Sequence, residues 1–88
     1  MQKRQQIIDF CEQTEIEVLL LPKEFDSAIV GLSIKFNEYS VVYDTRKCIE
    51  CLIENDGMTE ESANEYFEFN IVGSYLGPNT PTFLVDIL

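Results

Sequence analysis

The stretch AIVGLSIKFNEYSVVYD, residues 28–44, holds two runs of alternating side chains on either side of a short polar break. The first run predicts a half-buried strand whose apolar face carries Ala28, Val30, Leu32, Ile34 and Phe36. Asn37 and Glu38 supply a tight connection, and the run from Tyr39 to Asp44 continues as a second strand. The stretch therefore predicts a β-hairpin, although Asn-Glu is a weaker turn signal than Asn-Gly.

Two further elements are predicted ahead of the hairpin. Residues 2–14 fit a helix, since apolar and small side chains recur on one side at helical spacing: Ile7, Ile8, Phe10, Cys11 and Thr14. Residues 16–21, IEVLLL, fit a strand that presents Ile16, Val18 and Leu20 on one face. Pro22 ends this strand, because proline cannot donate a ladder hydrogen bond.

A helix is predicted directly after the hairpin, over residues 46–55. Asp44 or Thr45 can cap it, because a short side-chain oxygen accepts a hydrogen bond from a free backbone N–H. Gly57 suits the left-handed position that follows a helix.

Thr59 caps another helix, which runs to about Tyr75, and residues 77–81, GPNTP, break it. The remaining residues, TFLVDIL, form a last strand. The predicted order is α-β-β-β-α-α-β. We expect an α+β fold, a mainly antiparallel sheet of about four strands with helices on one face. With 88 residues and no repeat or linker, residues 1–88 are expected to form a single domain.

The charge of the chain is acidic and unevenly distributed. Sixteen acidic and six basic residues give a formal net charge of −10. All six basic residues lie in residues 1–47, so residues 48–88 carry acidic side chains alone. This balance argues against direct nucleic-acid binding and against an anionic membrane surface. The acidity either serves solubility or matches a basic protein partner.

The chain carries no signal for secretion or membrane insertion. Its beginning, MQKRQQIIDFCEQT, has no continuous apolar region, and no run approaches the roughly 18 apolar residues of a membrane span. Three cysteines are an odd number, unlike a secreted disulfide framework. We therefore expect a cytoplasmic protein.

The Cys48-Ile49-Glu50-Cys51 spacing is the one motif that suggests chemistry. On a helix, Cys48 falls with the apolar side chains and Cys51 at the edge of that arc, so packing is the first interpretation. A redox pair is disfavoured by Glu50, and a metal site would need further ligands in a chain without histidine. We expect no catalytic residue, no metal and no cofactor, and hence no enzyme.

Acidic residues cluster near the start of the third predicted helix, the one that Thr59 caps. Glu61, Glu65 and Glu68 follow one another at helical spacing and form a negative ridge. The spacing matches no metal-binding motif, so we expect a solvated or partner-facing surface. The candidate partner-binding residues are Glu54, Asp56, Glu60, Glu61, Glu65 and Glu68.

The same helix carries two further candidate features. Asn70 falls among side chains predicted to be buried, which makes it either a structural pin or a site residue. The candidate residues for a pocket or a structural polar contact are Tyr43, Asn70, Tyr75 and Thr80. On the opposite side, Phe69, Val72 and Leu76 form an apolar stripe that could mediate self-association, so a homo-oligomer is a further expectation.

Residues 25–83 resemble a family of small uncharacterised proteins encoded in bacteriophages and prophages. The pattern consists of Tyr43-Asp44, then Met58-Thr59 with Glu61, Ala63, Glu65 and Tyr66, then Asn70, Gly73, Gly77 and Thr80-Pro81. The resemblance implies a phage origin and the cytoplasm of a host cell, and it transfers no activity. It also implies caps at Asp44 and Thr59 and an Asn70 pinned against the following turn.

Three functional hypotheses follow. The first is a phage accessory protein whose acidic face blocks a basic host protein, such as a nucleic-acid-binding or defence protein. The alternative is an oligomeric protein that binds and sequesters a small molecule such as a nucleotide, although the shortage of basic residues argues against a phosphorylated ligand. A thiol redox enzyme is the least favoured.

Overall fold

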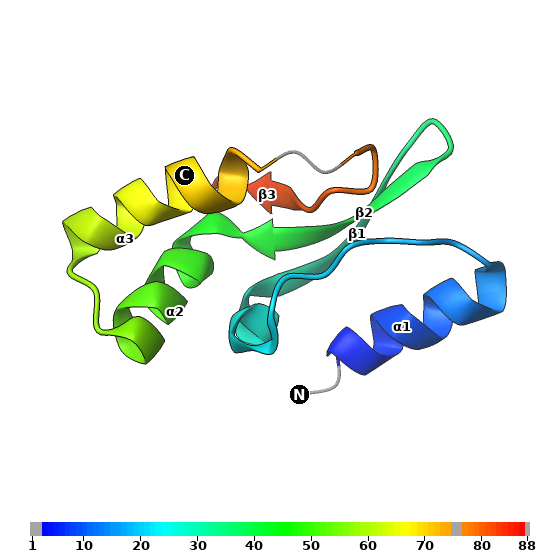
Figure 1. Ribbon diagram of the computed structural model, residues 1–88. Helices are drawn as coiled ribbons and strands as arrows, with labels where there is room; N and C mark the ends of the chain where they lie inside the picture. Colours follow the sequence, from blue (N-terminus) through cyan, green and yellow to red (C-terminus); the bar gives the residue numbers. More distant parts are fainter. Residues whose placement is uncertain (1–2, 75–76, 88) are drawn as a thin grey trace.

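A computed structural model describes residues 3–74 and 77–87 (Figure 1). Its elements in chain order are α1 (Lys3–Thr14), the 3-10 helix η1 (Lys23–Ala28), β1 (Ile29–Lys35), β2 (Glu38–Asp44), α2 (Thr45–Asp56), α3 (Glu60–Tyr66), the π-helical η2 (Phe67–Val72) and β3 (Thr82–Leu84). The fold class is α+β, as predicted.

The sheet has three strands in the order β1-β2-β3 within the described residues. β1 and β2 pair antiparallel as the predicted hairpin, whereas β2 and β3 pair parallel. The prediction of about four mainly antiparallel strands was therefore wrong in number and in the direction of the last strand. The helices α2 and α3 carry the chain back past the sheet, so β3 runs in the same direction as β2 (Figure 1).

The segment of residues 16–21 is the predicted strand that does not form. It runs as an extended chain beside the sheet (Figure 1), and its alternation holds, because Ile16, Val18 and Leu20 pack against the core. Among the described residues, its backbone–backbone hydrogen bonds join Ile16 N–H to Cys11 and Leu19 N–H to Asn79. Strand pairing needs a continuous partner backbone, and no described part of the chain supplies one to this segment.

The register of the hairpin differs from the prediction at two places. The turn residues are Phe36 and Asn37, one position earlier than expected, because Lys35 pairs with Glu38. A bulge between Ile29 and Gly31 turns Ile29 into the core. The predicted apolar face is therefore interrupted, with Leu32 packed against the core but Val30, Ile34 and Phe36 exposed.

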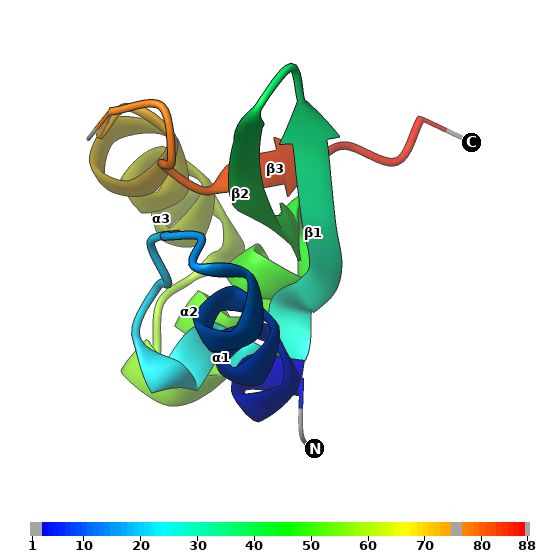
Figure 2. The ribbon, with the colours of Figure 1, turned by 90° about the vertical axis from the view of Figure 1, so that its right-hand side faces the viewer.

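The helices lie on one side of the sheet, as predicted, and the other face is uncovered (Figure 2). On the uncovered face, a row of hydroxyl groups crosses all three strands. The Ser40 hydroxyl lies 2.8 Å from that of Ser33 and 2.7 Å from that of Thr82. These side-chain hydrogen bonds tie β3 to the hairpin.

The core lies between the sheet and the helices. Its largest fully buried side chain is Tyr43, and buried Ala63 and Phe67 attach the α3–η2 helix to it. The rings of Phe67 and Phe83 meet edge to face with centroids 5.1 Å apart, an arrangement that favours aromatic pairs. From α1 only Ile7 and Cys11 are buried, so Phe10 and Thr14 of the predicted apolar side face outward.

The predicted helix caps are confirmed. The Asp44 carboxylate accepts a hydrogen bond from the Lys47 N–H at 3.0 Å, and the Thr59 hydroxyl accepts one from the Ser62 N–H at 3.1 Å. Gly57 adopts the left-handed conformation, with φ 68°, after α2. Of the two residues proposed to cap α2, Asp44 does so and Thr45 begins the helix.

The third predicted helix, which Thr59 caps, changes character at its C-terminal end. It continues from α3 into the π-helical η2 and stops at Val72, whereas Tyr75 lies outside the described residues. The Gly73 N–H donates to the Glu68 carbonyl at 3.1 Å, one residue further back than in an α-helix. A side chain at Gly73 would meet the Phe69 carbonyl oxygen at 3.0 Å, so glycine suits this position.

Replacing Phe36 by glycine is expected to stabilise the protein. Phe36 has φ 59° at the first turn position, where a side chain is strained, and its side chain is 87% exposed, so little packing is lost. We expect a gain of about 1 kcal/mol, which raises the melting temperature by roughly 4–8 °C. Asn37→Gly is the matched control, since Asn37 lacks the positive φ, and should show no gain. Equal melting temperatures for Phe36→Gly and the wild type would contradict the strain.

Candidate partner-binding surface

The α3–η2 helix presents acidic side chains outward because its other side is anchored in the core. Ala63 and Phe67, four positions apart, are buried, and Ile71 packs against them. The opposite side therefore faces solvent. Together with the C-terminal end of α2, it forms what we call the acidic face, whose six carboxylates are all exposed: Glu54, Asp56, Glu60, Glu61, Glu65 and Glu68.

Among the residues that the structure describes, one basic side chain forms an ion pair with the acidic face. Arg46 at the start of α2 lies 3.7 Å from Glu60 and 3.7 Å from Glu50. Both pairs are exposed, so each contributes little to stability. Within residues 3–74 and 77–87, the other five carboxylates of the acidic face form no ion pair. Their charge is therefore free to act on a partner.

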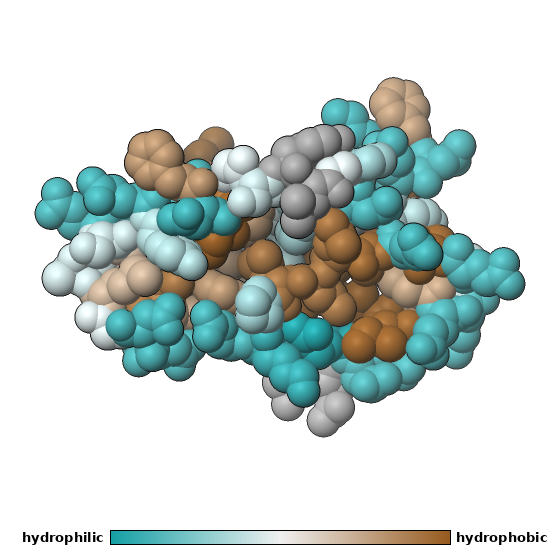
Figure 3. All heavy atoms as spheres, in the orientation of Figure 1, coloured by the Kyte–Doolittle hydropathy of each residue, from teal (hydrophilic) through white to brown (hydrophobic). Residues whose placement is uncertain are grey.

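An aromatic groove lies next to Glu65 of the acidic face. Its volume is about 370 Å³, and its lining residues are Met58, Ser62, Glu65, Tyr66, Phe69 and Asn70. Phe69 is 78% exposed and Tyr66 is 43% exposed, and Figure 3 shows apolar side chains standing out of a hydrophilic surface over α3. The juxtaposition of Glu65 with two exposed rings suits a guanidinium group, which can pair with a carboxylate and stack on a ring.

The proposed self-association stripe overlaps this groove. Phe69 and Val72 are exposed, as a contact surface requires, and Leu76 lies outside the described residues. Self-association through this stripe stays a prediction.

A second hollow, of about 380 Å³, brings two of the four predicted pocket residues together. Asn70 and Thr80 line it between η2 and the residues before β3, and Tyr75 lies outside the described residues. Tyr43 does not line it, because its ring is buried and its hydroxyl accepts a hydrogen bond from the Leu21 N–H at 2.9 Å. Asn70 is exposed, so the prediction of a buried pin was wrong.

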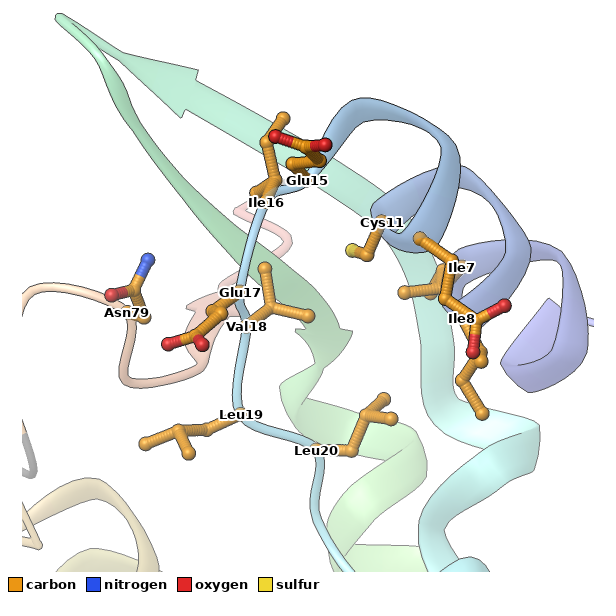
Figure 4. A pocket seen from close by; sticks show the side chains of 11 residues that line it. Ile7, Ile8, Cys11, Glu15, Ile16, Glu17, Val18, Leu19, Leu20 and Asn79 are labelled. Atoms are coloured by element: carbon orange, nitrogen blue, oxygen red, sulfur yellow. The ribbon is translucent and has the colours of Figure 1, made fainter.

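A third hollow, of about 680 Å³, was missed by the sequence analysis. It lies between α1 and the extended residues 16–21 (Figure 4). The patterns of residues 2–14 and 16–21 identify the side that each segment buries, but neither pattern shows that a hollow remains between the two segments. The sequence did contain one indication of this hollow, because glutamates alternate with apolar residues from Glu15 to Val18.

The cysteines are placed for packing rather than for chemistry. Cys48 and Cys51 are both buried, which corrects the boundary position expected for Cys51. Burial raises the pKa of the Cys48 thiol to about 12, and the neighbouring Cys51 and Asp44 act in the same direction. Redox cysteines need a lowered pKa, so this environment is the opposite of the one that redox chemistry uses.

The described residues also contain no group of three or more Cys, Asp or Glu side chains arranged to hold a metal ion. None of their helices is both long enough and apolar enough to cross a membrane. Comparisons of the chain with protein-family models, with curated proteins and with solved structures found no match.

Proposed function

We propose that the protein acts by binding a basic protein surface through the acidic face and the aromatic groove beside it. The observation that carries the proposal is the placement of Glu61, Glu65 and Glu68, which form no ion pair among the described residues, along one exposed helix next to Phe69 and Tyr66. Carboxylates form charge-assisted hydrogen bonds with Arg and Lys, and exposed rings add cation–π contacts. A net charge of −10 also steers a basic partner toward the protein.

The partner that we propose is a nucleic-acid-binding or defence protein of a host cell, and the protein itself a phage accessory protein. Such partners carry basic surfaces that hold phosphate groups. A row of carboxylates at helical spacing would occupy such a surface and prevent phosphate from binding. The phage context rests on the sequence resemblance, and the basic character of the partner rests on the acidic face.

Binding of a fluorescent Arg-rich peptide tests the chemistry of the acidic face. The triple variant E61Q/E65Q/E68Q is expected to weaken binding about 10-fold, since each exposed pair is worth about 0.2–1 kcal/mol. Phe69→Ala should weaken it about 2- to 5-fold through the lost cation–π contact. Both effects are read by fluorescence anisotropy, and wild-type binding should fall as salt is raised.

The matched control is D9N/E24Q/E38Q, which removes the same charge from exposed positions on other elements. It should bind the peptide nearly as the wild type does. Equal losses in the two triple variants would show that net charge alone attracts the peptide, and would overturn the assignment to this face. In a host lysate, proteins retained by the wild type but not by E61Q/E65Q/E68Q should be basic and should be displaced by duplex DNA.

The alternative function, sequestration of a nucleotide, receives less support. None of the three hollows has a Lys or Arg among the described residues that line it. A bound phosphate would therefore face no basic partner from this chain, unless a second subunit supplied one. A thermal-shift screen with nucleotides separates the two functions, since the acidic face predicts no stabilisation.

A further inference from the structure

We propose that the 680 Å³ hollow between α1 and residues 16–21 binds an aliphatic amine or guanidine, a small molecule with an apolar body and one cationic group. The site lies on elements that the acidic face does not use, so the proposal is independent of the function proposed above. It rests on the size of the hollow, on its apolar walls and on the charge of its rim.

The walls of the hollow are apolar side chains from two elements. Ile7 and Cys11 of α1 face Val18 and Leu20 of the extended segment across the gap, and Figure 4 shows the side chains of Cys11, Val18 and Leu20 pointing into it. In the space-filling view, apolar side chains gather in a hollow of this face, bordered by hydrophilic surface (Figure 3). The volume falls within the range of roughly 300–1,000 Å³ that is typical of small-molecule sites.

The rim of the hollow carries one sign of charge. Its ionisable residues besides Cys11 are Glu12, Glu15 and Glu17, and no Lys or Arg lines it among the residues described. None of these glutamates forms an ion pair in that part of the chain. An apolar anion would be repelled, and a neutral ligand would leave the carboxylates unused. A cationic head group beside an apolar body is the complement of both features.

Glu15 is placed on this rim at a conformational cost. It directly follows α1 with φ 58°, the left-handed position where glycine is preferred, and the N–H of the next residue, Ile16, donates a 3.0 Å hydrogen bond to the Cys11 carbonyl. A glycine there would relieve strain but would remove a carboxylate from the rim. Replacing Glu15 by glycine is therefore expected to have opposite effects: the stability of the free protein rises and its affinity for the ligand falls.

The test is a titration of the full chain with hexylguanidinium, with hexanol and hexanoate as probes of equal length. We expect hexylguanidinium to give saturable NMR shifts at the methyl groups of Ile7, Val18 and Leu20. Hexanol should bind at least several-fold more weakly, and hexanoate should give no saturable shifts. Equal affinities for hexanol and hexylguanidinium would overturn the role of charge, and shifts confined to α3 would overturn the site.

Variants complete the test. E12Q/E15Q/E17Q should weaken binding of hexylguanidinium about 10-fold, whereas D9N/E24Q/E38Q, with the same change of charge at residues that line neither this hollow nor the aromatic groove, should leave it unchanged. Glu15→Gly should raise the melting temperature of the free protein and still weaken binding about 2- to 5-fold. Unchanged affinity in E12Q/E15Q/E17Q would overturn this proposal. It would leave the function proposed for the acidic face unaffected, since the two sites share no residue.

Discussion

Raising the pH from about 9 to 12 is expected to remove much of the stability of the fold, because Cys48 must stay protonated inside it. The Cys48 side chain is fully buried, and burial raises its pKa from the ordinary value of 9.0 to about 12. Between these values the unfolded chain releases the proton and the folded protein keeps it. Stability is therefore complete below pH 9 and is lost progressively up to pH 12.

The expected loss is about 4 kcal/mol, since each pH unit in this window removes about 1.4 kcal/mol. Burial also raises the pKa of the Cys11 thiol and of the Tyr43 phenol, so both groups act in the same direction. Against a total stability of roughly 5–15 kcal/mol, such a loss would leave a domain of this size close to unfolding.

Urea unfolding at a series of pH values measures this effect, and two variants of α2 provide the comparison. Cys48→Ala should flatten the dependence on pH above 9, although its stability at pH 7 is lower than that of the wild type. Leu52→Ala, which removes an equally buried side chain of the same helix, should lose about 2–5 kcal/mol and keep the steep dependence. The explanation fails if Cys48→Ala is as sensitive to alkali as Leu52→Ala.

Tyr43→Ala is expected to be the most damaging single substitution in the sheet, with a loss of about 3–5 kcal/mol. Tyr43 is the largest fully buried side chain, and its ring lies 6.2 Å from that of Phe83. The substitution would leave a cavity between the hairpin and β3. Its hydroxyl is also the acceptor for the Leu21 N–H, so the same residue holds the extended segment against the sheet.

Tyr43→Phe separates the ring from the hydroxyl. It should cost about 1–3 kcal/mol, since the half-buried Leu21 N–H loses its acceptor. Hydrogen exchange at the Leu21 amide should accelerate by a larger factor than the loss of global stability alone would produce. Tyr39→Phe is the matched control on the same strand, because the Tyr39 hydroxyl makes no hydrogen bond within the described residues. Equal stability of Tyr43→Phe and Tyr39→Phe would contradict the role of the hydroxyl.

Local features of the fold could be predicted from the sequence because local chemistry determines them. The hairpin follows from alternation, and both ends of α2 and the start of α3 follow from Asp44, Gly57 and Thr59, whose capping groups act within a few residues. The positions of the bulge and of the turn could not be predicted, because Phe36 is an unusual residue for a positive φ.

Features that depend on distant partners could not be predicted. The alternation of residues 16–21 identified their buried face, but a strand also needs a neighbouring backbone, which no local pattern reveals. The parallel direction of β3 depends on where α2 and α3 deliver the chain. The exposure of the six acidic residues could be predicted from helical spacing, whereas Asn70 was misplaced because the inward side of the helix is limited to Ala63, Phe67 and Ile71.

The parallel pairing of β3 has a consequence for the order of folding. The hairpin and α2 are made from contacts close in sequence, whereas Ser40 and Thr82 are 42 positions apart. Closing so long a loop costs conformational entropy before any contact forms to offset it, so this contact is expected to form late. β3 spans three residues, so only a short parallel pairing with β2, the contact of Phe83 with Tyr43 and the hydroxyl row tie it to the hairpin within the described residues. The C-terminal strand is thus the last part of the sheet to dock and the first to detach.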